Sequence, residues 1–328
     1  PASVNQDEEY FTITNTTSAM IDVSHWRITG AVDFAFQGGT VIPTNGTLYV
    51  SPNVKAFRAR ASFPTGGQGL FVQGGYKGHL SARGEGIQLV DRTGQVIAQT
   101  NYPAAPSAAQ QSLRITELMY HPAPAPAGSP YLPDDFEYVE LRNVGATPLD
   151  LKGVRFTNGI GYDFTGSAIP SLAPGQRVLV VRSIAAFTSR YGTGLPIAGE
   201  YAGALNNGGE ALRLEDATGE VILDFSFNNS WYPVTDGLGF SLVIRDELAP
   251  WDAWGLAASW RPSGSDAGSP GGVDPAPRAS VPVVINEVLA HSANAGGDAI
   301  ELRNPAPSVA AIGGWYLSDD FANPTKYR

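Results

Sequence analysis

The chain contains no cysteine, and this absence excludes several kinds of site at once. Without cysteine there is no disulfide framework, no thiolate zinc site and no cysteine nucleophile. The zero count fits a cytosolic protein and equally a secreted protein that is stable without disulfides, so it does not decide the compartment. Stability must therefore come from packed cores and hydrogen bonds.

Charge is also scarce, since only 16% of the 328 residues are charged, and basic residues are the minority. The excess of acidic residues gives a formal net charge of -10. Surfaces that bind phosphate need clustered Lys and Arg, whereas the Arg residues here are scattered singly. We therefore expect no nucleic-acid partner. No run of about 18 apolar residues occurs, so we also predict no membrane span.

Glycine and proline, in contrast, are abundant, with 38 and 25 residues respectively. Val, Ile, Thr, Tyr and Phe are spread between them in short runs, which is typical of many short strands joined by tight turns. An all-β fold is the first prediction. Because 43% of the residues are hydrophobic, the chain has enough apolar surface for two or more domains with their own cores.

One block of sequence occurs three times in the chain. "FEYVELRNVGATPLDLKGVRF" begins at Phe136, and "DAIELRNPAPSVAAIGGWYL" begins at Asp298. A looser copy, "EEYFTITNTTSAMIDVSHWRI", begins at Glu8. The first two copies continue into a second similar block, "YKGHLSARGEGIQLVDRTGQVI" and "YAGALNNGGEALRLEDATGEVI", which the third copy lacks. Repeats of this kind indicate tandem modules.

The repeated text predicts strands and turns. "YVEL" and "AIEL" alternate apolar with polar residues, so Glu140 and Glu301 are predicted to face outward. The Asn after each strand suits a turn in which its side chain bonds the backbone ahead. Asp216 to Gly219 and Asp91 to Gly94 are compact hairpin signals, and Gly84 and Gly209 are predicted to turn the chain with positive φ. "SIAAFTSRYG" and "NVKAFRARA" each predict a short helix.

Seven to nine short strands per module are typical of an immunoglobulin-like sandwich. We predict tandem immunoglobulin-like β-sandwiches joined by Pro/Gly-rich linkers. The expected boundaries are a sandwich without its first strand at 1–103, a linker at 104–112, a complete sandwich at 113–230, a Trp/Pro/Gly-rich tail and linker at 231–282, and the N-terminal half of a third repeat at 283–328.

The blocks "RITELMYHP", "FEYVELRNVGATPLDLKGVRF", "IPSLAPGQRVLVV" and "LNNGGEALRLEDATGEVILDFSF" resemble, in this order, the lamin-tail domain. "WYPVTDGLGFSLVIRDE" and the residues after it are similar to the segment that follows such domains in very large extracellular proteins of environmental bacteria. The resemblance implies a non-catalytic module for interaction and architecture, located outside the cell or on its surface. It implies no catalytic residues and no cofactor.

Two sets of residues are candidates for ligand binding. The carboxylates Asp134, Asp135, Asp319 and Asp320 are weak calcium candidates, because oxygen ligands of this kind stiffen many extracellular β modules. Their spacing matches no calcium loop, and solvated loop carboxylates are the competing interpretation. Aromatic rings at Trp231, Tyr232, Trp251, Trp254 and Trp260 are weak carbohydrate candidates. The competing interpretation is that these rings pin the tail onto the sandwich.

Three functions remain open from the sequence. The first is a structural or adhesive scaffold that contacts other domains of a longer chain or copies of itself. The second is a carbohydrate-binding accessory region, and the third is the non-catalytic part of a larger secreted enzyme. A sharper hypothesis follows from the repeat, because the first copy lacks the opening strand that "VVINEV" at Val283 supplies to the third. A strand from another chain can complete an incomplete sheet edge. The competing interpretation is truncation of a longer chain.

Overall fold

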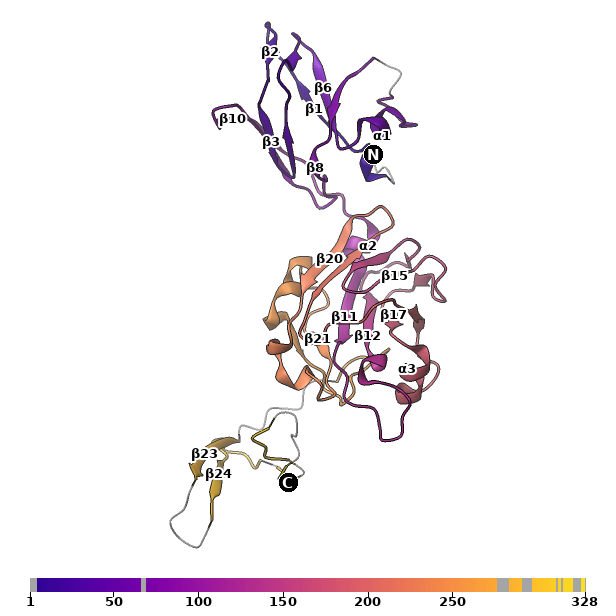
Figure 1. Ribbon diagram of the computed structural model, residues 1–328, viewed down its shortest axis with the longest axis vertical. Coiled ribbons are helices and arrows are strands. Elements are labelled where there is room, and N and C mark those ends of the chain that lie inside the picture. The colour runs from indigo at the N-terminus through magenta and orange to yellow at the C-terminus, as the bar shows by residue number, and fades with distance from the viewer. Residues whose placement is uncertain are drawn as a thin grey trace. The chain divides into compact units, whose positions relative to one another are not determined.

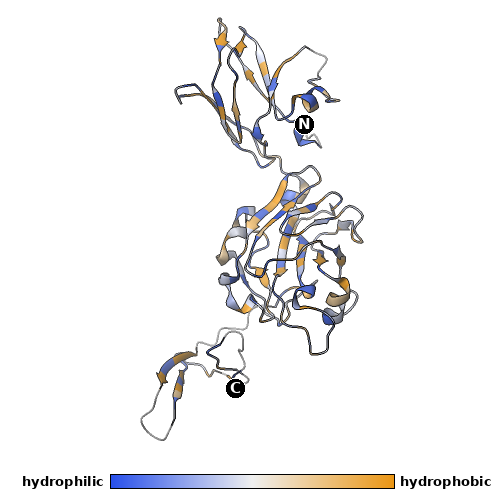
Figure 2. Ribbon diagram, viewed as in Figure 1, coloured by the Kyte–Doolittle hydropathy of each residue, from blue (hydrophilic) through white to orange (hydrophobic). Residues whose placement is uncertain are grey.

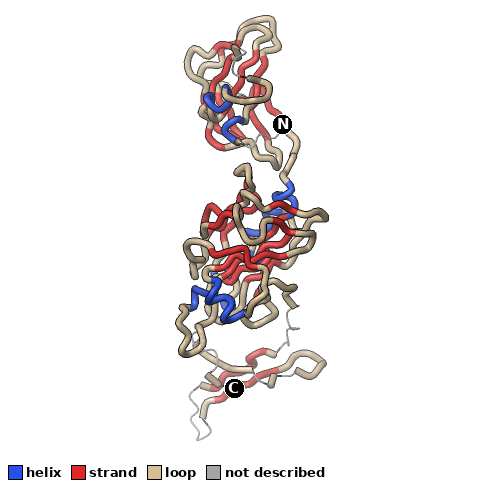
Figure 3. The backbone as a smooth tube through the Cα atoms, turned by 90° about the vertical axis from the view of Figure 1, so that its right-hand side faces the viewer, coloured by secondary structure: helices blue, strands red, loops and turns tan. Residues whose placement is uncertain are grey.

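The computed structural model describes residues 5–65, 69–275, 283–290, 297–310, 312–313, 315–320 and 326–327. It divides into two compact units, residues 1–275 and 276–328. Strands dominate the described residues, with a few short helices between them (Figures 1 and 3). The prediction of an all-β fold built from tandem immunoglobulin-like sandwiches is confirmed.

The first sandwich contains the strands β1 to β10. A three-stranded sheet has the order β1-β6-β7, and a five-stranded sheet has the order β10-β9-β3-β4-β8. The short strands β2 and β5 pair beside them. The bounds are β1 Phe11–Thr14, β2 Ile21–Asp22, β3 Arg27–Gly30, β4 Val32–Ala35, β5 Val41–Ile42, β6 Thr47–Ser51, β7 Phe71–Gly74, β8 Lys77–Gly78, β9 Gly86–Val90 and β10 Val96–Asn101, with the helices η1 Gln6–Glu8 and α1 Val54–Arg58.

The second sandwich repeats this plan and adds to it. Its larger sheet has the order β18-β17-β12-β11-β21-β22, and its second sheet has the order β15-β14-β19-β20. The bounds are β11 Leu113–Met119, β12 Tyr138–Asn143, β13 Leu149–Asp150, β14 Arg155–Asn158, β15 Tyr162–Asp163, β16 Ser171–Leu172, β17 Arg177–Val181, β18 Ile197–Glu200, β19 Ala211–Glu215, β20 Val221–Ser226, β21 Leu242–Ile244 and β22 Trp260–Pro262, and the helices are α2 Ala108–Ser112, α3 Ile184–Tyr191, η3 Pro133–Phe136, η4 Asn229–Trp231, η5 Pro233–Thr235, η6 Trp251–Gly255 and η7 Ala257–Ser259.

Local signals explain most of these elements. Asn53 caps α1 and Ser183 caps α3 through side-chain oxygens that accept backbone N–H groups, so both predicted helices are confirmed. The two predicted hairpins join β9 to β10 and β19 to β20. Gly84 and Gly209 have φ values of +79° and +101°, as predicted, and a side chain at Gly209 would collide with the carbonyl of Phe227.

Each sandwich has its own apolar core, and Figure 2 shows hydrophobic stretches, in orange, on the strands of both. Ile28, Leu48 and Leu89 belong to the core of the first sandwich, and Phe156, Val178 and Leu214 occupy the matching places in the second. A smaller apolar cluster lies on the outer face of the larger sheet of the second sandwich, where Phe187 of α3 packs on Tyr138. This sheet is therefore covered on both faces.

The segments that were predicted to be a linker and a tail belong largely to the second sandwich instead. Helix α2, within the expected linker, buries Ala109 and Gln110 in the second sandwich. Within the expected tail, β21 pairs with β11 and with β22, so these residues extend the larger sheet. The reason is burial of aromatic surface, because Trp254 and Trp260 are 0% exposed. Residues 276–282, the end of that segment, lie outside the described residues.

The second unit is described by itself. β23 (Val284–Leu289) pairs antiparallel with β24 (Ala299–Arg303), with a bulge between Ile285 and Glu287. β11 and β12 have a bulge at the matching place, between Ile115 and Glu117. The β23–β24 hairpin thus repeats the β11–β12 pair, as the third copy of the sequence predicts. Among the described residues of this unit, β23 and β24 are the only strands longer than an isolated β-bridge.

Candidate functional site

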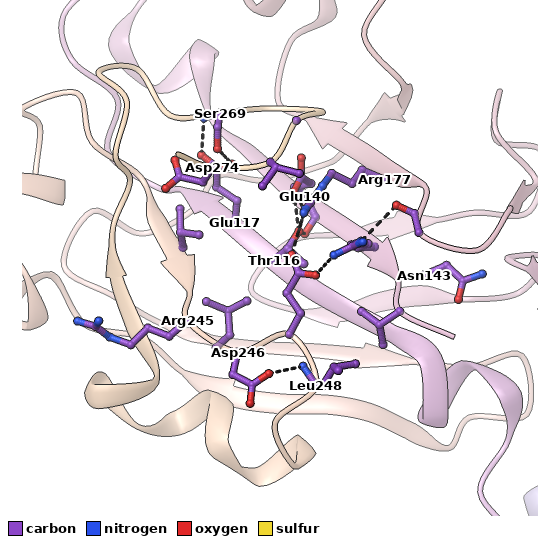
Figure 4. Close-up of a pocket in the computed structure, with 18 of the residues that line it drawn as sticks. Thr116, Glu117, Glu140, Asn143, Arg177, Arg245, Asp246, Leu248, Ser269 and Asp274 are labelled. Carbon is purple, nitrogen blue, oxygen red and sulfur yellow. Dashed lines mark hydrogen bonds and ion pairs between the residues drawn. The ribbon is translucent and has the colours of Figure 1, made fainter. Parts of the chain in front are cut away.

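The candidate site is a cavity of about 600 Å³ on the outer face of the larger sheet of the second sandwich (Figure 4). β11, β12 and β17 form its floor, and two stretches of chain after β20 form its walls. One wall is residues 243–248, and the other is residues 263–274, which we call the covering segment. Figure 4 shows Glu117 and Glu140 extending from neighbouring strands toward the covering segment, which contains Ser269.

Glu117 is 1% exposed and its carboxylate accepts four hydrogen bonds. Oε1 accepts from the Tyr138 hydroxyl at 2.6 Å, the Ser241 hydroxyl at 2.5 Å and the Ser269 N–H at 2.8 Å. Oε2 accepts from the Ser269 hydroxyl at 2.9 Å. A buried carboxylate is tolerated only when its oxygens are bonded in this way. Glu117 therefore fastens the covering segment to the sheet.

Gly268 makes the close approach possible. Its φ is +80°, and a Cβ on it would stand 2.1 Å from the hydroxyl oxygen of Tyr138. A side chain at this position would therefore push the covering segment away from Glu117.

Glu140 is also 1% exposed and fastens the same segment two residues further on. Its Oε2 accepts from the Gly271 N–H at 2.7 Å, and its Oε1 accepts from Thr116 Oγ1 at 2.6 Å and from Arg177 Nη1 at 2.5 Å. Burial raises the pKa of Glu140 to about 7, and the positive charge of Arg177 opposes this rise.

A second layer of ion pairs closes the cavity toward residues 243–248. Glu247 accepts from Arg177 Nη2 at 2.8 Å and also pairs with Arg142. Within the covering segment, Asp274 pairs with Arg261 of β22. Each of these charged groups pairs with another group of the same chain, so the ion pairs of the site are internal contacts. Among the described residues, no three His, Asp or Glu side chains gather as metal ligands.

Glu140 was predicted to face outward, and in one respect this was wrong. The strand alternation does point it away from the main core, where Val139 and Leu141 lie. The outer face is itself covered, however, so Glu140 is buried. Glu301, its counterpart in β24, accepts from Asn286 Nδ2 at 2.5 Å, as Glu140 accepts from Thr116. The covering segment was read as linker, and its Gly and Ser content gave no sign of these contacts.

One carboxylate makes the same hydrogen bonds in both sandwiches, and the sequence analysis did not identify it as a candidate. Glu137 accepts from the Tyr201 hydroxyl at 2.6 Å and from the Leu205 N–H at 2.8 Å. In the first sandwich, Glu9 accepts from Tyr76 and from the Leu80 N–H at 2.9 Å each. Burial raises the pKa of Glu137 to about 7 and raises that of Glu9 as well. The Glu and Tyr residues at matching positions of the repeat are the sequence signal that could have predicted this contact.

The calcium candidates are engaged by protein groups. Asp135 accepts from the Leu132 N–H at 2.8 Å, and Arg182 lies 3.7 Å from Asp134 and 3.9 Å from Asp135. In the second unit, Lys326 lies 2.6 Å from Asp319 and 3.7 Å from Asp320. A cation at either place would compete with an existing positive charge.

The carbohydrate candidates differ in how much surface they offer. Trp254 and Trp260 are fully buried, and their indole N–H groups donate to Ile115 O at 2.9 Å and Trp254 O at 2.8 Å. Neither ring can meet a sugar while the sandwich is folded. Trp231 and Tyr232 pack partly buried against the same core. Trp251 is 41% exposed, and the guanidinium of Arg83 lies 4.6 Å from its ring centroid.

A second cavity, of about 710 Å³, is lined by residues of the first sandwich and by Thr218 and Glu220 of the second. Phe11 and Thr12 of β1 line it together with Ile87 of β9 and Thr100 of β10. β1 and β10 are the terminal strands of their two sheets.

Comparison with known proteins gives one family. The model of the Lamin Tail Domain family matches residues 1–104 and again residues 106–229. No curated protein matches the chain. The two matched segments coincide with the two sandwiches, and the second ends just before residues 231–275 that complete the larger sheet.

Proposed function

Because this chain belongs to the lamin tail domain family, which is immunoglobulin-like and generally non-catalytic, we propose that it is a structural scaffold that acts through protein–protein contact and assembles with copies of itself. The observation that supports this most is the use of the repeated residues. Asn15 and Asn143 each bond backbone carbonyls across a turn, and Asp91 and Asp216 each cap a hairpin. What the modules share is therefore architecture.

The buried charges support the same proposal. A catalytic carboxylate must reach a substrate, whereas the carboxylate oxygens of Glu117, Glu137 and Glu140 accept hydrogen bonds from groups of the same chain. No described helix is long and apolar enough to cross a membrane. We propose an extracellular or cell-surface setting in a bacterium, because residues 231–275 resemble the segment that follows such domains in large extracellular bacterial proteins.

The experiment is the solution mass of the whole chain by light scattering, over a hundredfold range of concentration, with and without calcium. Self-assembly predicts a mass that climbs above 34.6 kDa as concentration rises. A mass that stays at the monomer value at every concentration would contradict assembly. The calcium arm tests Asp134, Asp135, Asp319 and Asp320, because a structural calcium ion there would shift the mass or the melting temperature.

A further inference from the structure

We propose that the two sandwiches move as one rigid body, because Arg83 of the first sandwich acts as a clamp on the second. Both sandwiches belong to one compact unit of the chain, residues 1–275. Residues 102–107, between the end of β10 and the start of α2, join them, and we call these residues the connector. The inference goes beyond the proposed function, because a rigid junction spaces the two modules whether or not the chain assembles with copies of itself.

The connector is fastened to the first sandwich at its start. The Ala105 N–H donates to Ala82 O, in the loop before β9, at 2.7 Å. Gly84 permits this close approach, because a Cβ on it would stand 2.7 Å from Ala104 N and 2.9 Å from Tyr102 O. The chain therefore leaves the first sandwich in a defined direction.

The connector is also fastened to the second sandwich at its end. The Ser107 hydroxyl donates to Asp216 Oδ2 at 2.6 Å, and its oxygen caps α2 by accepting the Gln110 N–H at 3.2 Å. Gln110 is 0% exposed, and its Nε2 donates to Val221 O at 3.0 Å. The chain therefore enters the second sandwich in a defined direction as well.

Further contacts cross the junction without passing through the connector. Glu220, in the turn between β19 and β20, is 8% exposed. Its Oε2 accepts from the Ala82 N–H of the first sandwich at 3.1 Å and from Gln110 Nε2 at 3.4 Å. One carboxylate thus holds the loop before β9 and the helix α2 at the same place, and this limits bending of the connector between them.

Arg83 extends from the same loop onto β20 of the second sandwich. Its Nη2 donates to Ile222 O at 2.8 Å and to Val221 O at 3.3 Å. Its guanidinium carbon also lies 4.6 Å from the ring centroid of Trp251, in η6. A planar guanidinium can stack on an aromatic face while it donates hydrogen bonds. This single side chain therefore holds a strand and a turn of the second sandwich at once.

Charge favours the same arrangement. Burial lowers the pKa of Arg83, and the negative charges of Glu220 and Asp252 oppose this fall. The cation comes from the first sandwich and both carboxylates come from the second. Trp251, which is 41% exposed, therefore faces a cation of its own chain, and this contact assigns the ring to the junction.

Arg83 is not part of the plan that the two sandwiches share. The loop before β9 repeats as the loop before β19, where Gly84 corresponds to Gly209 and Arg83 to Gly208. The repeated glycine has positive φ in both copies, so it serves the fold of each module. The Arg side chain has no counterpart in the second copy, and its contacts all lie across the junction, so its role is specific to this pair of modules.

The absence of cysteine makes the junction directly measurable. We would attach spin labels to Gln88→Cys and Lys152→Cys, which are exposed positions in the first and second sandwich, and measure the distance distribution in the full chain by double electron–electron resonance. A tenfold excess of unlabelled chain suppresses distances between copies. A rigid junction predicts one narrow distribution, as narrow as that of the control pair Lys152→Cys and Ala185→Cys within the second sandwich.

Variants at the clamp should loosen the junction. Arg83→Ala should widen the distribution at least twofold, and Trp251→Ala should widen it by removing the ring on which Arg83 stacks. Arg83→Lys keeps the charge but not the planar fork, so we expect an intermediate width. The matched control is Arg27→Ala, because Arg27 pairs with Asp33 inside the first sandwich. The width of the control pair should stay unchanged in every variant.

Each outcome decides the inference. A wild-type distribution at least twice as wide as that of the control pair overturns the rigid junction. A narrow distribution that neither Arg83→Ala nor Trp251→Ala widens overturns the clamp, as does equal widening by Arg27→Ala. The result is independent of the mass in solution, so a chain that stays monomeric overturns self-assembly and leaves a narrow distribution as evidence for the junction.

Discussion

The two sandwiches share one plan, and the second has what the first lacks. β12 is buried along nearly its whole length between two neighbouring strands, whereas β1 is an edge strand with alternate exposed residues. Three of the six residues of β20 are buried, whereas every residue of β10 is exposed. In the second sandwich β11 lies beside β12, and η6, within residues 231–275, contacts β20. A neighbouring strand and a following segment therefore bury strands that are exposed in the first sandwich.

The largest expected effect comes from removing the aromatic anchor of that segment. Trp254→Ala should lower the free energy of unfolding of the second sandwich by about 3–5 kcal/mol, because it leaves a large cavity and an unpaired carbonyl at Ile115. Hydrogen exchange as a function of urea reports on each sandwich separately. Trp251→Ala is the matched control at an exposed ring, and an equal loss there would contradict the anchoring role of Trp254.

The next effect separates the two repeated carboxylates. Glu137→Ala leaves the Tyr201 hydroxyl and the Leu205 N–H without an acceptor in a fully buried site, so we expect a loss of about 2–4 kcal/mol in the second sandwich. Glu9→Ala removes the same bonds in a half-buried site and should cost less in the first sandwich. Urea unfolding of both variants measures the difference. Equal losses would contradict the expectation that the deeper burial of Glu137 makes its hydrogen bonds worth more than those of Glu9.

The pH dependence of stability should differ between the sandwiches. Burial raises the pKa of Glu137 and of Glu140 to about 7, from a usual value of 4.5. The folded state therefore holds these protons more tightly, so the stability they contribute is full below pH 4.5 and is lost as the pH rises to 7. Acidifying from pH 7.5 to 5.5 should stabilise the second sandwich by about 1–2 kcal/mol per carboxyl.

Glu140→Gln should remove the contribution of Glu140 to that pH dependence, because an amide does not titrate. Urea unfolding at several pH values measures both proteins. A variant with the same pH slope as the wild type would show that Glu140 is ionised across this range.

The smallest expected difference between the sandwiches concerns what they have in common. Asn15 and Asn143 make the same turn, since each side chain donates to two or more carbonyls and accepts an N–H two residues ahead. Changing either to Ala should cost its own sandwich about 1–3 kcal/mol. We expect the two losses to agree within about 1 kcal/mol. A larger gap, measured by the same exchange experiment, would mean that the stability of the turn depends on whether the strand before it is an edge strand or an interior strand.

The sequence predicted the elements that depend on neighbours along the chain. Turns at Asn143, hairpins at Asp216 and the cap of α3 at Ser183 are set by side chains that bond backbone only a few residues away. Alternation then assigned the faces of β12 correctly. These features need no knowledge of distant contacts.

The candidate site could not be predicted in this way. The covering segment has no periodic pattern, and its contacts with Glu117 and Glu140 span more than a hundred residues of sequence. Alternation shows which way a side chain points but not whether that face is covered. Trp254 and Trp260 lie among short 3₁₀ turns, and only the burial of their rings reveals that they complete a sheet.

The most direct test of the difference between the two sandwiches is hydrogen exchange in β1 and β12 of the full wild-type chain. Because N–H directions alternate along a strand, the amides of Thr12 and Thr14 point away from β6, and we predict that they exchange rapidly, while the amides of Glu140 and Arg142 in the interior strand β12 stay protected. Protection of Thr12 and Thr14 equal to that of Glu140 and Arg142 would contradict the account of β1 as an edge strand.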